Sequence, residues 1–445
     1  MSKNSEELGN NPIKKLLIKQ AVPASVGILI MSIYGIVDTI FVGRYVGSLG
    51  IAAITVVMPI TFLISSIGMA IGMGGASIIS RSLGGDNEEK ALLTFGNQAT
   101  LTVVLAIGIV LLGSFFQEEI LVVFGGRGEI LPYAKEYFQI TLYGVPFLAW
   151  AMMSNNVIRA EGAPKIAMLI LVVPAVVNMI LDPILIVYLD WGIAGAAWAT
   201  SLAYIASASY SLFFFFGGKS EMRLFAKNLR LKFEIVREIF SLGIVTLARQ
   251  GTVSILFIVL NNSLFTYGNE ASIAVYGIIN RVMMFANFPV LGITQGYVPI
   301  AGYNYGAEKF ARVKTVINLA IKWGTLIAIV IFVGILSFAE PLVAIFTKDQ
   351  SLIDETGIAL RKVFIATPLI AVQLMGAAYF QAIGKAIPAL LLTLTKQGFF
   401  LIPLFLILPP YFGLDGIWYA FPIADVSAAA ITYYFLRKET AKLKV

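Results

Sequence analysis

The stretch SRSLGGDNEEKA at residues 80–91 returns in altered form as GYNYGAEKFARV at residues 302–313. Gly84 aligns with Gly306, 222 residues later. The same register, without a gap, aligns further pairs across most of each half: Ile51 with Ile273, Gly74 with Gly296, Asp86 with Glu308, Pro146 with Pro368, Ala160 with Ala382 and Gly162 with Gly384. The chain of 445 residues therefore contains two copies of one sequence unit, each about half its length.

The repeat lies in a very apolar chain. Hydrophobic residues make up 58% and charged residues 13%, and the mean hydropathy is +0.87. Soluble domains carry about 25% charged residues, so lipid rather than water is expected to face most of this surface. Near the end of each copy the register shifts by one residue, because Gly192 aligns with Gly413 and Gly195 with Gly416. A two-fold repeat in such a chain is typical of a transporter built from two pseudo-symmetric lobes, with its cavity between them.

Missing residue types exclude several kinds of chemistry. The chain has no cysteine and no histidine, which excludes disulfides, zinc sites and catalysis by a thiol or an imidazole. Proton chemistry near neutral pH must then use carboxylates. The run Gly217–Ser220 resembles the end of a phosphate-binding loop, but Phe213 stands where that loop needs its first glycine. We therefore expect no enzyme, no cofactor and no ATP-driven step, and an ion gradient as the energy source.

Long apolar segments predict the membrane spans. A spanning helix needs about 20 mostly apolar residues. The first half contains six such segments, at residues 16–43, 51–79, 92–116, 136–158, 166–188 and 193–216. The second half contains six more, at residues 239–266, 273–303, 314–337, 358–381, 387–408 and 416–436. We predict an all-α integral membrane protein with twelve transmembrane helices in two pseudo-symmetric six-helix lobes, related as a parallel repeat.

The charged loops predict how the chain lies in the membrane. We assign residues 1–218 to the N-terminal lobe, the polar stretch 219–237 to a cytoplasmic linker, and residues 238–445 to the C-terminal lobe. With both termini in the cytoplasm, 22 of the 32 lysines and arginines lie on the inner side and six on the outer side. The N-terminal stretch lacks the features of a signal peptide, so we expect a short cytosolic tail. We expect a multi-pass protein of the cytoplasmic membrane of a prokaryote, whose net charge of +7 reflects topology rather than nucleic-acid binding.

Two acids lie deep in the predicted spans of the first lobe, Asp38 and Asp182. A charge at the bilayer centre costs about 2.5–3.5 kcal/mol, so each acid needs a partner or a wet cavity. Tyr34 precedes Asp38 by one turn and Asn178 precedes Asp182 by one turn, so each pair shares a helix face. With Thr200 of the sixth span, these residues are predicted to form a coupling site for H+ or Na+. Asp38, Asn178 and Asp182 would supply hard oxygen ligands to Na+; the alternative is that both acids brace neighbouring helices.

Other polar residues of the first lobe are candidates for a substrate cavity that includes Asp38. They are Tyr137, Asn155 and Asn156 of the fourth span. The alternative use of the asparagines is hydrogen bonding between helices. Pro23 lies fifteen residues before Asp38 within the first span, where it can kink the helix because proline removes a backbone donor; the alternative is that a membrane helix tolerates it.

The second lobe lacks the two acids. The positions 222 residues after Asp38 and Asp182 hold Leu260 and Leu404, so the cation chemistry is expected in the first lobe alone. The arginines of the second lobe are candidates for pairing with backbone carbonyls or with Asp425, or for a place near the cytoplasmic ends of their spans. The sequence leaves open the roles of four charged residues: Arg249, Arg281, Lys396 and Asp425.

Five motifs in order across both halves resemble the MATE (multidrug and toxic compound extrusion) family. They are VDTIFVGRYVGSLGIAAI at 37–54, the repeated stretches at 80–91 and 301–313, NNVIRAEGAPK at 155–165, NMILDPILI at 178–186 and GIAGAAWATSLAY at 192–204. The resemblance covers essentially the whole chain. It implies a V-shaped transporter of two six-helix lobes that exports organic, often cationic or amphiphilic compounds in exchange for protons or sodium ions.

Within that family the acid-rich first lobe looks like the DinF-type branch. The resemblance places the branch's first-helix acid on Asp38 and its fifth-helix pair on Asn178 and Asp182. It also places a sixth-helix threonine on Thr200 and the bend of helix one near Pro23. Other branches use acids in the seventh and tenth helices, where this chain has Arg249-Gln250 and Gln373, so a second-lobe coupling site is not expected.

We therefore predict a secondary active antiporter that works by alternating access. Its partners would be small organic substrates and membrane lipid, with no nucleic acid, and it would act as a monomer. One alternative is a flippase for lipid-linked oligosaccharides or other amphiphiles, which would favour a cavity rich in positive charge. A second alternative, of another class, is a membrane receptor or scaffold with no transport cycle.

Overall fold

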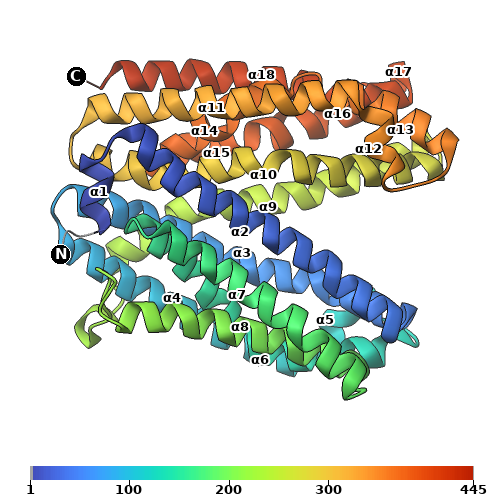
Figure 1. Ribbon diagram of the computed structural model, residues 1–445, viewed down its shortest axis with the longest axis horizontal. Coiled ribbons are helices and arrows are strands. Elements are labelled where there is room, and N and C mark those ends of the chain that lie inside the picture. The colour runs from blue at the N-terminus through green and yellow to red at the C-terminus, as the bar shows by residue number, and fades with distance from the viewer. Residues whose placement is uncertain (1–3, 444–445) are drawn as a thin grey trace. The chain divides into compact units, whose positions relative to one another are not determined.

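Helices make up every regular element of the computed structural model, which describes residues 4–443 (Figure 1). The first half contains α1 (Asn4–Asn10), α2 (Ile13–Tyr45), α3 (Ser48–Gly84), α4 (Glu88–Phe115), α5 (Gln117–Val123), α6 (Ile130–Ala160), α7 (Pro164–Asp182), the π-helix η1 (Pro183–Tyr188), α8 (Gly192–Phe216) and the short η2 (Ala226–Asn228).

The second half repeats this order with more interruptions. It contains α9 (Phe233–Tyr267), α10 (Glu270–Gly306), α11 (Phe310–Ser337), α12 (Ala339–Ala344), α13 (Gln350–Val363), η3 (Thr367–Leu369), α14 (Ile370–Ala382), α15 (Ala386–Leu394), the π-helix η4 (Thr395–Leu401), α16 (Ile402–Ile407), α17 (Pro409–Phe412) and α18 (Leu414–Ala441). The short helices α5 and α12 begin 222 residues apart, so they belong to the same repeat as the spans.

Each of the twelve predicted spans coincides with a helical segment. Among the described residues, nine helical segments are long and apolar enough to cross a membrane, and α13 passes the same test together with η3 and α14, from which it is bent by 42°. The remaining two predicted spans are α6 and α18. These two helices are less apolar because they carry polar residues that the protein itself buries, such as Asn155 and Arg159 in α6 and Asp425 in α18.

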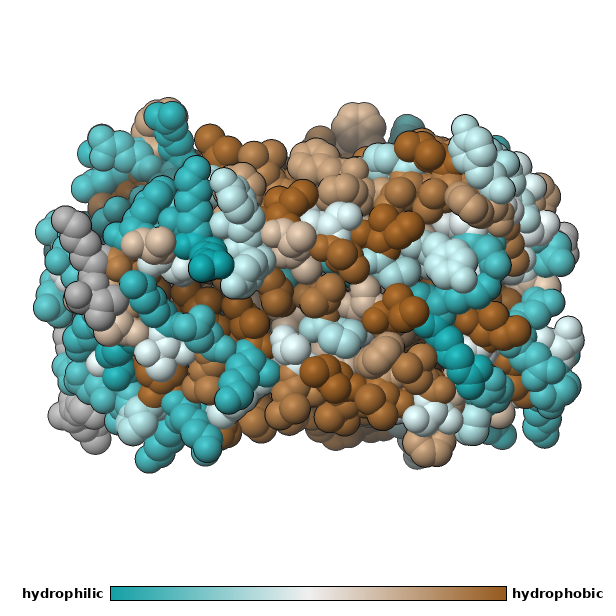
Figure 2. Space-filling view, turned by 90° about the horizontal axis from the view of Figure 1, so that it is seen from above, coloured by the Kyte–Doolittle hydropathy of each residue, from teal (hydrophilic) through white to brown (hydrophobic). Residues whose placement is uncertain are grey.

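The outer surface agrees with a membrane environment. On the face drawn in Figure 2, hydrophobic side chains gather along the middle of the helices and hydrophilic ones toward their ends. Large apolar side chains are turned outward, among them Val104 and Leu112 of α4, with more than half of their surface exposed. Lipid tolerates such side chains, whereas the backbone polar groups must be satisfied inside the helices.

The chain divides into two compact units. Unit 1 contains the residues up to Asn10 together with Val26–Thr246, and unit 2 contains Asn11–Ser25 together with the chain from Leu247 onward. Two helices therefore change unit along their length. Helix α2 begins in unit 2 and continues in unit 1, whereas α9 begins in unit 1 and continues in unit 2.

Two glycines, in α3 and α10, allow close packing against the N-terminal parts of α9 and α2, the parts that lie in a different unit from the rest of their helix. A Cβ atom on Gly74 of α3 would lie 2.2 Å from the carbonyl oxygen of Ile239 in α9, within unit 1. Its repeat partner Gly296 of α10 would place a Cβ atom 2.7 Å from the amide nitrogen of Ala21 in α2, within unit 2. Only glycine allows two backbones to approach this closely, so the repeat preserves a packing contact as well as a sequence pattern.

Polar contacts connect α1, the loop that follows α6 and the loop that follows α8. Ser5 donates to Glu221 through its amide and its hydroxyl, at 2.8 and 2.5 Å. The hydroxyl of Ser220 and the amide of Glu221 donate to one carboxylate oxygen of Glu161, at 2.7 and 3.0 Å. Gly162 has a φ of 87°, and a Cβ atom there would lie 2.6 Å from a carbonyl oxygen of α1.

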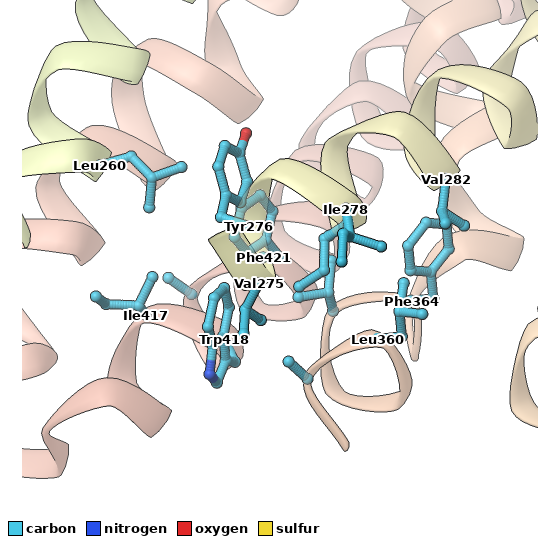
Figure 3. Close-up of a cluster of buried hydrophobic side chains, with 14 of the residues drawn as sticks. Leu260, Val275, Tyr276, Ile278, Val282, Leu360, Phe364, Ile417, Trp418 and Phe421 are labelled. Atoms are coloured by element: carbon cyan, nitrogen blue, oxygen red, sulfur yellow. The ribbon is translucent and has the colours of Figure 1, made fainter. Parts of the chain in front are cut away.

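Unit 2 has a large apolar core. Its buried cluster joins side chains of α9, α10, α13 and α18, including Leu260, Tyr276, Leu360, Trp418 and Phe421 (Figure 3). The ring of Tyr276 stacks on that of Phe421 with centroids 6.3 Å apart. This aromatic packing lies one helical turn before Asp425, in α18.

Candidate ion-coupling site

Asp182 occupies an unusual place in the helix. It is the last residue of α7, and Pro183 follows it as the first residue of η1. Proline has no amide hydrogen, so the α-helical hydrogen-bond ladder cannot continue unchanged through this point. The chain continues instead as a π-helix, in which the amide of Leu189 donates to the carbonyl of Ile184, five residues earlier, at 2.9 Å. Such π segments often mark functional positions in helices.

Asp38 and Asp182 face each other within unit 1. Their carboxyl groups interact with each other. Asp182 is fully buried, and among the described residues neither of its carboxylate oxygens accepts a hydrogen bond. Asp38 Oδ1 is likewise buried without a donor. Buried polar atoms are nearly always paired, so these oxygens are suited to bind a proton, a cation or water.

Asn178 and Thr200 add oxygen atoms to the same place. The side-chain amide of Asn178 donates to the Thr200 hydroxyl at 3.5 Å. This contact leaves Asn178 Oδ1 buried and without a donor. Asn178 precedes Asp182 by one turn of α7, so the amide oxygen and the carboxylate lie on one helix face. The set consists of hard oxygen donors, which suit a proton or a sodium ion and not a soft metal.

Three tyrosines interact electrostatically with Asp38. The hydroxyl groups of Tyr34 and Tyr204 interact with each other, and both rings lie near Asp38. Tyr137 of α6 interacts with Thr200 and also lies near Asp38. The sequence interpretation missed Tyr204. Its signal was its spacing of four residues from Thr200 on the same span, which places both residues on one helix face.

The asparagines of α6 lie elsewhere. Asn155 follows Tyr137 by 18 residues, which corresponds to about 27 Å along a helix. Its side chain donates to the carbonyl of Ala167 at 2.6 Å and accepts a hydrogen bond from Arg159 at 3.4 Å. Asn156 donates to a carbonyl within α6 at 2.9 Å. The structure therefore brings Tyr137 to the acids but does not bring the two asparagines there.

Pro23 lies inside α2, which runs as one helix from Ile13 to Tyr45. It precedes by two residues the point after Ser25 at which α2 passes from unit 2 to unit 1. A proline in a helix interior removes one ladder hydrogen bond and lowers the resistance to bending. Its predicted role as a helix bend stays a prediction.

The charged residues of the second half are arranged differently from the acids of the first. Asp425 pairs with Lys396 at 2.5 Å, and not with either arginine. Arg249 is partly buried in the middle of α9 and Arg281 is exposed on α10. Neither arginine forms an ion pair within residues 4–443.

The MatE family model matches the chain twice, at residues 23–184 and again at residues 245–407. The two matches begin 222 residues apart, which is the offset of the internal repeat. They cover more than half of the chain, so the protein belongs to the MATE family of membrane transporters. The resemblance stated from the motifs is thereby confirmed, and members of this family are transporters rather than enzymes.

Relatives and solved structures agree with this assignment. The multidrug export protein MepA of Staphylococcus aureus (strain N315) is 29% identical over 430 residues, which cover 96% of this chain and 95% of MepA. An outward-facing multidrug resistance MATE family transporter of the MOP superfamily superposes with a TM-score of 0.92 at 25% identity, over 100% of this chain and 99% of that one. A MATE structure in the bent conformation gives a TM-score of 0.94 at 25% identity, covering 100% and 98%.

The fold prediction is also confirmed. The chain is a multi-pass membrane protein with the all-helical architecture of MATE transporters, twelve spans in two lobes. Family membership establishes a multidrug-efflux type of transporter, whereas the ion that drives it and the residues that bind this ion belong to the proposal that follows.

Proposed function

We propose that the protein is a secondary active antiporter of the cytoplasmic membrane. It exports organic compounds, often cationic and amphiphilic, in exchange for H+ or Na+. Family membership and the name of MepA support multidrug export. One observation supports ion coupling in unit 1: buried oxygens of Asp38, Asn178 and Asp182 accept no hydrogen bond among the described residues.

Repulsion between the two acids supplies the driving force for ion binding. Two neighbouring ionised carboxylates repel each other strongly when little water screens them. A proton shared between Asp38 and Asp182, or a sodium ion between them, removes that repulsion. Asn178 Oδ1 adds a further oxygen to those of the two acids. The amide nitrogen of Asn178 donates to the hydroxyl of Thr200, which leaves Oδ1 free to accept the ion.

The same acids link the ion to the substrate. Tyr34, Tyr137 and Tyr204 give Asp38 aromatic neighbours, which suit the apolar and cationic parts of a drug. An ion that neutralises the carboxyl pair weakens the attraction for a cationic substrate. The ion can shift the balance between outward-facing and inward-facing states only through its different affinity for the two. Bending of α2 near Pro23 would connect ion binding to that change.

The arrangement in the membrane follows the charge distribution. We propose that the chain forms a lobe of residues 1–218 and a lobe of residues 238–445, connected by the linker 219–237. Both termini and this linker would lie in the cytoplasm. The excess of lysine and arginine on that side supports this orientation. The protein would act as a monomer in contact with lipid, with small organic molecules as substrates and no cofactor.

Efflux from proteoliposomes tests the proposal. A fluorescent organic cation is loaded, and a pH gradient or a sodium gradient is imposed with the membrane potential clamped. The wild-type protein should respond to one of the two gradients, and Asp38→Asn should respond to neither. Asp190→Asn is the matched control, because Asp190 is an exposed acid of the loop before α8 whose φ of 56° suits asparagine.

Three outcomes would contradict the proposal. Gradient-driven efflux that survives in Asp38→Asn would remove Asp38 from coupling. Equal loss in Asp38→Asn and Asp190→Asn would indicate damage that is not specific to the site. Transbilayer movement of a fluorescent lipid without any dependence on either gradient would favour a flippase.

A further inference from the structure

Lys396 and Asp425 form an ion pair in the interior of unit 2. Lys396 Nζ lies 2.5 Å from Asp425 Oδ1, and the two side chains are only 13% and 9% exposed. Lys396 lies in the π-helix η4, and Asp425 lies in α18, which packs along η4. Within the described residues, Lys396 is the charged group that acts on Asp425.

The sequence repeat relates this pair to the acids of unit 1. The offset of 221 residues that aligns Gly192 with Gly413 also aligns Tyr204 with Asp425. Tyr204 is the residue of α8 that lies near Asp38. In both halves the sixth span of the repeat therefore carries a polar side chain at the same inward position. In unit 2 that side chain is itself a carboxylate.

The two carboxylate sites differ in what neutralises them. In unit 1, oxygens of Asp38 and Asp182 have no hydrogen-bond donor among the described residues, so a cation from outside the chain can bind there. In unit 2, an ammonium group of the chain already lies at salt-bridge distance from the carboxylate. An ammonium carries the same charge as Na+ or H+.

We propose that Lys396 is a tethered cation that occupies the carboxylate of Asp425, so that unit 2 contains a latent cation site and binds no transported ion. Lys396 would in this way limit the protein to the ion bound in unit 1. Only this last consequence rests on the proposed function of Asp38 and Asp182. The latent site itself rests on the geometry of unit 2.

The carboxylate of Asp425 needs a cation because its side chain is only 9% exposed and its neighbour Ala424 belongs to the apolar core of unit 2. Phe421 lies one turn before Asp425 in α18, and its ring stacks on that of Tyr276 (Figure 3). The ring centroids of Phe405 and Phe421 are 5.3 Å apart. Such an apolar environment makes an unpaired carboxylate unfavourable. Once Lys396 no longer neutralises it, Asp425 must take up a proton or a cation from outside.

The test removes the ammonium group of Lys396 in a variant that also lacks both carboxylates of unit 1. In the Asp38→Asn, Asp182→Asn background we add Lys396→Gln and purify the full chain in lipid nanodiscs. Binding of radioactive sodium is measured directly, and the infrared band of a protonated carboxyl group is recorded by difference spectroscopy. We expect one additional sodium ion or one additional protonated carboxyl group per molecule. Adding Asp425→Asn should abolish this additional sodium ion or protonated carboxyl group. Lys396→Arg, used in place of Lys396→Gln, should show neither the sodium ion nor the protonated carboxyl group, because it keeps the positive charge.

Chemical restoration of the charge gives a second route. The chain contains no cysteine, so Lys396→Cys introduces a single thiol that a methanethiosulfonate reagent modifies selectively. Attachment of an aminoethyl group restores an ammonium and should remove the new site, whereas attachment of a neutral ethyl group should leave it intact. The double variant Lys396→Gln, Asp425→Asn serves as a folding control, because a neutral pair can replace a buried ion pair without loss of stability.

The proposal is overturned if neither Lys396→Gln nor unmodified Lys396→Cys gains a bound sodium ion or a protonated carboxyl group. It is also overturned if the gained signal survives Asp425→Asn. These outcomes are independent of the coupling site in unit 1, because both acids of that site are absent from the background. Unchanged gradient-driven transport in Asp38→Asn would instead contradict the proposed function and leave the latent site standing.

Discussion

Ser207 of α8 donates a hydrogen bond of 2.7 Å to the carbonyl oxygen of Ile170 in α7. Pro174 follows Ile170 by four residues and has no amide hydrogen, so it leaves that carbonyl without its usual helical donor. Unit 2 contains a similar contact at a position that the sequence repeat does not align with the first: Ser263 donates at 3.1 Å to the carbonyl of Phe405, which also precedes a proline by four residues. Side chains of neighbouring helices thus satisfy backbone groups that lipid cannot.

The first prediction concerns this hydrogen bond. Ser207→Ala should lower the free energy of unfolding by about 1–3 kcal/mol, because it leaves a buried carbonyl unpaired. In a Pro174→Ala background the loss should be smaller, since the alanine introduced there supplies the missing amide hydrogen. Thermal unfolding in detergent measures both effects, and Ser209→Ala, on the exposed side of the same helix, is the control. Equal losses in both backgrounds would show that Ser207 acts in another way.

The second prediction concerns the glycine contact of α3 with α9. Gly74→Ala should destabilise the protein by about 1–3 kcal/mol, because the new Cβ atom would lie 2.2 Å from a backbone oxygen that cannot rotate away. Gly108→Ala in α4 is the matched control, since a Cβ atom there meets nothing within 4 Å. Alanine in that helix should be neutral or stabilising. Equal unfolding temperatures for the two variants would show that the backbone of Ile239 does not exclude a side chain at position 74.

The third prediction concerns pH and the buried carboxyl group of Glu161 in the loop after α6. Burial is the main cause that raises the pKa of Glu161 from its ordinary value of 4.5 to about 8, although its hydrogen bonds with Ser220 and Met222 lower it. The folded state therefore holds this proton more tightly than the unfolded state does. Stability from this group should be fully present below pH 4.5 and should fall as the pH rises through about 8.

Glu161→Gln tests this pH dependence, because glutamine resembles the protonated carboxyl group. The unfolding temperature of the wild type should decrease from pH 6 to pH 9 by more than that of Glu161→Gln. Asp190→Asn, at an exposed acid, should follow the wild type. Identical pH profiles for the wild type and Glu161→Gln would contradict the role assigned to burial.

The fourth prediction concerns ion binding to the acids of unit 1. A ligand that binds only the folded state stabilises it by about 2.7 kcal/mol at a concentration of 100 times its dissociation constant. Sodium ions or acid should therefore raise the unfolding temperature of the wild type, and Asp182→Asn should reduce this rise strongly. Potassium at equal ionic strength controls for screening. A sodium response that is the same in Asp182→Asn and in the wild type would place the ion elsewhere.

Much of the fold could be predicted from the sequence. Spans such as 193–216 are long apolar segments, and the structure has α8 at Gly192–Phe216. The short helix α5 was missed because its seven residues carry the acids Glu118 and Glu119 in the first turn and are too few to give a span signal. Its repeat partner α12 was missed for the same reason of length.

One sequence could not predict that the N-terminal part of α2 packs in unit 2 and that of α9 in unit 1. Nothing in the apolar pattern of α2 distinguishes the residues before Ser25, which pack in unit 2, from those after it. The glycines Gly74 and Gly296 mark close contacts, but a glycine does not identify the backbone that approaches it. Long-range packing of this kind depends on the whole fold.

The site was partly predictable. The spacing of Asn178 and Asp182 fixes their common face whatever surrounds them, and the structure brings Asp38 to them. Asn155 was considered for the same cavity because it is polar within an apolar span. Its distance along α6 from Tyr137 separates it from that group, and its hydrogen bond to Ala167 satisfies its amide.

Ion coupling through Asp38 is tested by a variant that can still exchange substrate but cannot use a gradient. In proteoliposomes, we would measure net uphill efflux of an organic cation and, separately, the exchange of labelled for unlabelled cation at equilibrium, for the wild type and for Asp38→Asn. We expect Asp38→Asn to lose gradient-driven efflux by at least tenfold and to retain exchange, although at a lower apparent affinity because one carboxylate that attracts the cation is gone. Gradient-driven efflux in Asp38→Asn equal to that of the wild type would contradict it.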